Sequence, residues 1–195
     1  MVYEIKTFDN LIGIKGFSER LLKNHFTLYQ GYVANFNKLN DTLVKMEKEG
    51  NFSSPEFAEL NRRFAWEFNG MRLHELYFEN MTKNFNDLSK NSELFKAIAK
   101  EWGSLENWKN DFISMGKMRG IGWIILYYDP DGKRLFNVWI NEHDTGHFAG
   151  GIPLLVMDVF EHAYIIDYEL KRADYIDSFF KAIDWNAVSK RFENT

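Results

Sequence analysis

Cysteine is absent from the 195-residue sequence. A disulfide scaffold, a thiolate metal site and a cysteine nucleophile are therefore excluded. A large excess of one charge is also absent: 24 lysines and arginines stand against 28 aspartates and glutamates, so the net charge at pH 7 is only −4. Nucleic-acid binding would need a basic patch. The longest apolar runs, such as Ile152–Met157, are far shorter than the roughly 20 residues that a helix needs to span a bilayer.

We also expect no secretory signal, because the first ten residues are polar and mixed in charge. We therefore expect a cytoplasmic protein that binds neither nucleic acid nor membranes. Hydrophobic residues make up 45% of the chain and aromatic residues 17%, which favours a buried core and argues against disorder. The length suits one large domain or two small domains that share a core.

The first part of the chain, to about residue 85, has a helical pattern. Ser18 is a candidate N-cap, and Glu19 in the first turn suits the helix dipole. A polar stretch, Glu47–Ser54, interrupts the pattern, and a second helix is predicted from Pro55 to Met81. In the first helix, apolar and aromatic residues recur at helical spacing at Leu21, Leu22, His25, Leu28, Tyr29, Tyr32, Val33 and Phe36.

The second part mixes helices and strands. Helical patterns cover Ser92–Glu101 and Leu105–Met115, and a helical pattern returns from Glu161 onward. Three strands are predicted at Gly122–Tyr128, Lys133–Ile140 and Leu154–Met157, with a Pro-Asp-Gly turn joining the first two. We predict an α+β fold: an N-terminal helical hairpin domain (residues 1–88), then a C-terminal α+β domain (residues 89–195) with a small three-stranded antiparallel sheet.

The candidate site residues are histidines and one aspartate. Asp158 and His162 lie four residues apart, where an apolar run ends and a helix is predicted to begin, so both side chains can point to one place. A carboxylate at a buried strand end needs a cation or hydrogen-bond donors. The alternative is an N-cap aspartate followed by a surface histidine, and spacing alone favours that alternative.

Two further histidines lie on apolar helix faces. His74 has Leu73, Tyr77 and Phe78 around it, and His25 shares a face with Tyr32. Two helices packed side by side would each present one histidine to the same interior point. Three imidazoles and one carboxylate suit iron or manganese, with zinc as an alternative. A single histidine on such a face is more often an ordinary packed side chain.

A resemblance to a known family begins at residues 158–164, Asp-Val-Phe-Glu-His-Ala-Tyr. This segment resembles the signature of the iron/manganese superoxide dismutases, which usually have tryptophan where Phe160 stands. Further segments are similar to that family: Gly120–Trp123, Tyr32–Asn37, Asp167–Tyr168, Lys171–Tyr175, Asp184–Trp185 and Lys190–Phe192. The resemblance implies one iron or manganese ion per subunit, held by His25, His74, Asp158 and His162 between the two domains.

The first of these ligands needs a choice between neighbours. The family's spacing, counted back from Tyr32, reaches Asn24, but asparagine is a poor ligand for this metal. His25 lies seven residues, or two helical turns, before Tyr32 and shares its face more closely. We therefore predict His25, with a one-residue deletion in this helix.

The resemblance also implies roles around the metal. Tyr32 would stand at the mouth of the substrate channel and relay protons. The family also has a hydrogen-bond donor to the solvent at the metal, which comes from one of two positions. Gly70 occupies one position and offers no donor, so His143, at the other position, would be the donor. Tyr29 falls where the family commonly has a second-shell histidine, and Trp123 would keep the cavity dry. An exposed loop position is the alternative for His143.

Three more residues match interface and entrance positions of the family. Glu161 and Tyr164 would lie across a subunit interface, where the glutamate of one subunit orients the ligand histidine of the other. Arg172 would attract the anionic substrate near the entrance. The alternatives are a solvated glutamate for Glu161 and a surface ion pair for Arg172. His147 has no role that the sequence suggests.

These implications predict a superoxide dismutase, which converts two superoxide anions to dioxygen and hydrogen peroxide and forms a homodimer or tetramer. The shifted histidine and Phe160 keep one alternative open: a dismutase-like metal-binding protein without activity, serving as a sensor or interaction module. A non-haem iron oxygenase with two histidines and one carboxylate is a further alternative. The sequence leaves iron against manganese undecided.

Overall fold

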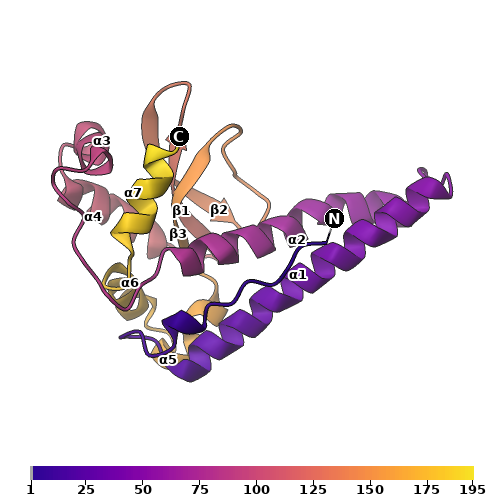
Figure 1. Cartoon of the computed structure of the whole chain (residues 1–195), viewed down its shortest axis with the longest axis horizontal. Coiled ribbons are helices and arrows are strands. Elements are labelled where there is room, and N and C mark those ends of the chain that lie inside the picture. The colour runs from indigo at the N-terminus through magenta and orange to yellow at the C-terminus, as the bar shows by residue number, and fades with distance from the viewer. Residues whose placement is uncertain (1) are drawn as a thin grey trace.

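The computed structural model describes residues 2–195, and it begins with a long helical hairpin. Helix α1 spans Glu19–Lys48 and helix α2 spans Pro55–Glu79. Figure 1 shows the two helices packed side by side and extending well beyond the rest of the molecule. Ser18 accepts a hydrogen bond from the Leu21 N–H, and Ser54 does the same for Phe57, so serine caps begin both helices.

Helix α2 ends two residues before the predicted end at Met81. The Asn80 side chain donates to the carbonyl of Val156 at 2.8 Å, and Met81 forms an isolated β-bridge with Ile183. These contacts with distant segments, one from the Asn80 side chain and one through the Met81 backbone, hold the chain where it leaves the helix.

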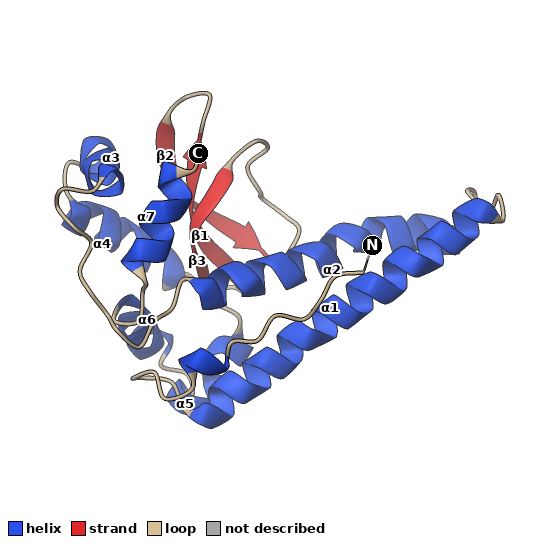
Figure 2. Ribbon diagram, in the orientation of Figure 1, coloured by secondary structure: helices blue, strands red, loops and turns tan. Residues whose placement is uncertain are grey.

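The C-terminal part contains the predicted antiparallel sheet of three strands (Figure 2). Strand β1 lies between the other two in the order β2-β1-β3, and the residues from Gly122 to Tyr127 are buried. The bounds of the elements from here to the end of the sheet are α3 Glu93–Trp102, α4 Leu105–Gly116, β1 Gly122–Asp129, β2 Arg134–Asn141 and β3 Ile152–Asp158.

The segment after the sheet differs from the prediction. No α-helix begins at Asp158, which is the last residue of β3 and pairs with Trp123. Its carboxylate accepts the Phe160 N–H at 2.8 Å, a local bond that turns the chain away from helical geometry. The helical elements that follow are short: a 3-10 turn at Glu161–Ala163, then α5 Ile165–Tyr168, α6 Arg172–Phe180 and α7 Trp185–Glu193.

The α+β fold class is confirmed, with the helical hairpin first and the small sheet second. One buried apolar cluster runs through both halves, from Phe8 and Leu21 to Ile125 and Val188. The boundary at residue 88 stays a prediction. Within residues 2–195 there is no helix with the length and apolarity that crossing a membrane requires.

Candidate metal centre

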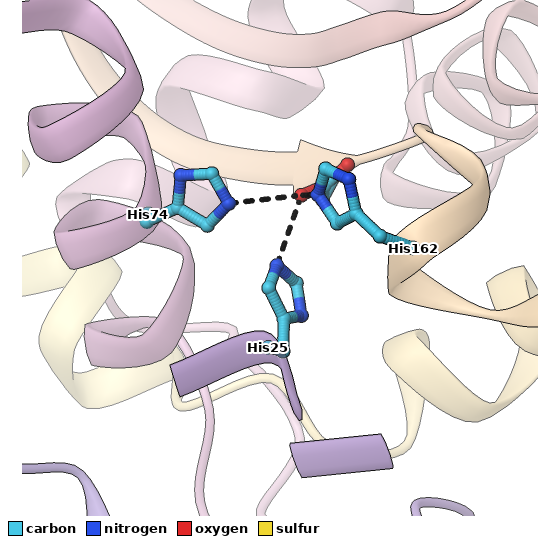
Figure 3. A group of neighbouring side chains, drawn as sticks. His25, His74 and His162 are labelled. Carbon is cyan, nitrogen blue, oxygen red and sulfur yellow. Dashed lines mark hydrogen bonds and ion pairs between the residues drawn. The ribbon is translucent and has the colours of Figure 1, made fainter. Parts of the chain in front are cut away.

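Four side chains from distant parts of the chain converge at one buried point (Figure 3). His25 comes from α1, His74 from α2, Asp158 from the end of β3, and His162 from the 3-10 turn. One potential ligand atom from each lies within 4.8 Å of all the others. The first helix contributes His25 and not its neighbour, because Asn24 is exposed whereas His25 is 2% exposed.

The three imidazoles face a single oxygen atom. The Nε2 atoms of His162, His25 and His74 lie 3.0, 3.2 and 3.8 Å from Oδ2 of Asp158. Only the bond to His162 has hydrogen-bond geometry, and Nε2 of His25 and of His74 are buried without a hydrogen-bond partner. Two unpaired buried nitrogens beside a buried carboxylate are costly unless another group satisfies them. A metal ion fits this requirement, and the nitrogen and oxygen donors suit iron or manganese.

The tautomer of His74 supports this fit. Its Nδ1 lies 2.5 Å from the carbonyl of Gly70. A carbonyl can only accept, so Nδ1 carries the proton and the lone pair of Nε2 points into the cluster. A hydrogen bond from the ring nitrogen that does not face the metal fixes the ring of a metal-binding histidine and raises its basicity.

The protonation states also suit a cation. Burial lowers the pKa of His25. Burial and, after it, the neighbouring His25 lower the pKa of His74 well below its usual value. Burial acts to raise the pKa of Asp158, but the facing His162 and His25 outweigh it and hold that pKa far below its usual range. The centre therefore offers the neutral imidazoles of His25 and His74 and one carboxylate, the forms in which these groups bind metals.

A second group of side chains lies beside the first. His143 is fully buried, so it is not an exposed loop residue. Its Nδ1 lies 3.1 Å from Nε1 of Trp123, and its Nε2 lies 2.7 Å from the hydroxyl of Tyr32. The Tyr32 ring stacks on His74 at 5.2 Å, and Trp123 meets His74 edge-on at 5.0 Å. The structure thus brings three of the predicted residues against the metal centre.

Burial shifts the pKa of both polar members of this group. It lowers the pKa of His143 to about 4 and raises that of Tyr32 to about 12. At neutral pH, His143 is therefore neutral and Tyr32 keeps its proton.

Tyr29 lies elsewhere. Its ring is buried against Phe8 and Phe78, and its hydroxyl is bonded to Glu75 and to the backbone N–H of Lys6. Neither bond involves a member of the four-residue cluster. Phe160, where the family usually has tryptophan, stacks on both His143 and His162, with ring centroids 4.8 and 5.1 Å apart.

The predicted interface and entrance residues, Glu161, Tyr164 and Arg172, line one pocket. Glu161 is exposed, whereas Tyr164 is buried and its ring stacks on Tyr175. Arg172 donates to the carbonyls of Met118 and Gly120 at 2.7 and 2.8 Å and to the Tyr164 hydroxyl at 3.2 Å. This guanidinium joins the loop between α4 and β1 to the Tyr164 side chain, and its role at the entrance stays a prediction.

Sequence reasoning missed a bridge made by His147. Its Nε2 lies 2.8 Å from the His143 carbonyl and its Nδ1 lies 2.7 Å from the Tyr127 hydroxyl. It also missed Trp66, which meets His143 edge-on at 4.8 Å. The signal for Trp66 was present: it stands eight residues before His74 and four before Gly70, on one row of the helix surface.

The Tyr32 ring packs directly against the backbone of Gly70. A Cβ atom at Gly70 would lie 2.5 Å from Cδ1 of Tyr32. Only glycine leaves room for the tyrosine ring to reach His143 and stack on His74.

Comparison with known proteins agrees with this geometry. A family model described as "Iron/manganese superoxide dismutases, C-terminal domain" matches residues 90–191. "Superoxide dismutase [Mn]" of Haloarcula marismortui is 37% identical over 179 residues, which covers 91% of this chain and 86% of that protein. "Superoxide dismutase [Fe]" of Cupriavidus metallidurans is 35% identical over 198 residues, covering 98% and 97%.

A third relative is "Superoxide dismutase [Fe]" of Aquifex pyrophilus, 34% identical over 199 residues, with 98% of this chain and 92% of that protein covered. The relatives named for manganese and for iron are similar to the chain in nearly equal measure, so the choice of metal stays open. Both the domain match and the end-to-end similarity confirm the resemblance, and the chain belongs to the iron/manganese superoxide dismutase family.

Proposed function

We propose that this protein is a superoxide dismutase, which converts two superoxide anions and two protons to dioxygen and hydrogen peroxide. The observation that carries the proposal is the convergence of three Nε2 atoms on one carboxylate oxygen, with two of those nitrogens buried and unpaired. Organic side chains such as these have no one-electron couple of their own, so the reaction requires a redox ion.

One iron or manganese ion per subunit would be held by His25, His74, Asp158 and His162, between the N-terminal and C-terminal domains. When bound, it supplies the redox couple that accepts an electron from one superoxide and returns an electron to the next. The ionised carboxylate of Asp158 provides one negative charge against the charge of the ion, and the imidazoles of His25 and His74 are neutral. That partial neutralisation makes the buried cation tolerable.

The surrounding side chains would control water and protons. Trp123 and Phe160 cover the centre with apolar surface, and Trp123 is fully buried. Hydrogen peroxide formation consumes protons, and the Tyr32 hydroxyl is a protonated donor next to the centre. His143 holds Tyr32 in place through its ring nitrogen. We therefore assign Tyr32 and His143 to proton delivery.

The first experiment joins metal content to activity. The purified protein is stripped of metal, reloaded separately with iron and with manganese, and assayed for superoxide dismutation. We expect about one ion per subunit and activity with at least one of the two metals. The His74→Gln variant should lose metal. Stoichiometric metal without dismutation would support the alternative of a metal-binding sensor or interaction module, and failure to bind either ion would contradict both proposals.

We also propose that the protein is a homodimer joined through the surface around Glu161. The His162 side chain is 28% exposed there, so one ligand histidine lies open at the surface. Three exposed apolar side chains, Met118, Ile121 and Leu170, line the same surface pocket as Glu161. A second copy would cover this apolar patch. Sedimentation should give a dimer, and a tetramer would require a second contact. We place the protein in the cytoplasm.

A further inference from the structure

A small surface pocket lies directly outside Tyr32. It has a volume of about 240 Å³ and is formed between α1, with Tyr32 and Asn35, and α2, with Arg63, Trp66 and Glu67. The Tyr32 ring separates this pocket from His74 and His143, which it contacts on its inner side. An anion approaching the metal centre from this side would pass through the pocket.

Arg63 is the one cation among the described residues that line the pocket. Its Nε donates to Oε1 of Glu67 at 3.0 Å, and its guanidinium lies over the Trp66 ring, 4.6 Å from the centroid. These two contacts fix the plane of the guanidinium. The side chain of Arg63 is 47% exposed, whereas that of Glu67 is 7% exposed.

The pair is therefore arranged with its positive end outward. Glu67 engages only Nε, and within residues 2–195 the terminal nitrogens of Arg63 have no hydrogen-bond partner. Four N–H groups remain free to meet an anion at the pocket. Arg172, the predicted entrance cation, has three of its five N–H groups engaged by two carbonyls and a hydroxyl, at least one on each of its nitrogens.

The charge of Arg63 also reaches the inner residues. After burial, which raises the pKa of Tyr32 most, the carboxylates of Asp158 and Glu67 raise it further and Arg63 acts to lower it. Burial is likewise the main cause of the low pKa of His143, and Arg63 contributes in the same direction. A cation whose charge reaches both residues also acts on an anion in the pocket outside Tyr32.

We propose that Arg63, held by Glu67 and Trp66, is the residue that attracts the superoxide anion into the pocket outside Tyr32. This inference rests on the proposed function for the identity of the anion. The attraction is electrostatic, so it acts on any small monovalent anion and weakens as salt screens the charge. Glu67 opposes it, because its carboxylate lies within the same pair.

The test uses azide, a monovalent anion, titrated against the metal-loaded protein and followed by the absorption spectrum of the metal. We expect Arg63→Gln to weaken azide binding about threefold to tenfold at low ionic strength, and less than about twofold at 0.5 M salt. Glu67→Gln should strengthen binding at low salt. Arg63→Lys should restore most of the affinity, because it restores the charge.

A second ion pair on the same helix provides matched controls. Arg62 is bonded to Glu59 at 2.6 and 2.9 Å, and its side chain is 75% exposed. Arg62→Gln and Glu59→Gln make the same changes in net charge next to the pocket pair, and each should alter azide affinity less than about twofold. In dismutation, Arg63→Gln should lower kcat/KM at low salt and leave kcat unchanged.

The outcomes separate the two proposals. If Arg63→Gln matches Arg62→Gln in azide affinity while the wild-type protein dismutates superoxide, the role of Arg63 is wrong and the proposed function stands. A weakening of azide binding by Glu67→Gln also contradicts the role of Arg63. If azide binding depends on Arg63 but the metal-loaded protein does not dismutate superoxide, the proposed function fails and the anion pocket stands.

Discussion

The indole of Trp123 fixes the position of a proton on His143. Nε1 of Trp123 lies 3.1 Å from Nδ1 of His143, and an indole nitrogen can only donate, so Nδ1 accepts. Neutral His143 therefore carries its proton on Nε2, 2.7 Å from the Tyr32 hydroxyl. Tyr32 accepts this bond, which leaves its own proton free to be donated elsewhere.

Replacing the donor should release this arrangement. In Trp123→Phe, Nδ1 of His143 remains buried without a donor, and we expect a loss of about 1–3 kcal/mol in the free energy of unfolding. The proton should then be shared between the two ring nitrogens. Nitrogen-15 NMR of labelled histidine in the metal-free protein reports the tautomer. An unchanged Nδ1 signal would contradict the assignment.

Gly70 should tolerate no side chain. A Cβ atom there would lie 2.5 Å from the Tyr32 ring, so Gly70→Ala should displace Tyr32 and lower stability by about 1–3 kcal/mol. Gly31→Ala on α1 is the control, because its Cβ atom would meet nothing within 4 Å. Removing that helical glycine should raise stability by up to about 1 kcal/mol. Urea unfolding of both variants measures the contrast, and equal effects would contradict the packing argument.

The metal-free protein should lose stability below pH 6.5. The folded-state pKa values of His25, His74 and His143 are all lowered by burial. Between those values and the unfolded value near 6.5, the unfolded chain binds more protons, so stability falls as pH falls, by about 1.4 kcal/mol per pH unit for each proton.

Asp158 should not contribute to this window. Its folded pKa is depressed, so its stabilisation is present above the unfolded value near 3.9 and is lost only in stronger acid. Urea unfolding between pH 5 and 8 tests the prediction, and His143→Gln should reduce the slope. A free energy of unfolding that is independent of pH would contradict it.

His147 should hold the loop that carries His143. A carbonyl accepts the Nε2 proton of His147, so Nδ1 accepts from the Tyr127 hydroxyl. His147→Phe removes both bonds and should cost about 1–3 kcal/mol of stability. It should also lower dismutase activity, because the backbone of His143 loses its support. Tyr127→Phe keeps the bond to the carbonyl and should retain more activity. The reverse order of activities would contradict this role.

Local patterns predicted the hairpin and the sheet well. Serine caps at Ser18 and Ser54 set the beginnings of α1 and α2, and the Pro-Asp-Gly turn sets the hairpin between β1 and β2. Each of these signals acts within a few residues, so the sequence states it directly. The end of α2 depends on a bond to the distant strand β3, and no local pattern contains that bond. The turn after Asp158 combines a local bond to Phe160 with the pairing of Asp158 and Trp123 across the sheet.

The candidate site divides in the same way. The sequence by itself determined the four predicted ligands: helical periodicity puts His25 on the Tyr32 face and His74 on an apolar face, and the resemblance of residues 158–164 to the family signature implies Asp158 and His162. Only the tertiary structure decided that Arg172 binds the carbonyls of Met118 and Gly120, that Trp66 contacts His143, and that Arg63 lines the pocket outside Tyr32. The physical reason is that a side chain's donors go to whatever carbonyl, ring or carboxylate the fold brings near it, and that proximity arises between segments far apart in the chain.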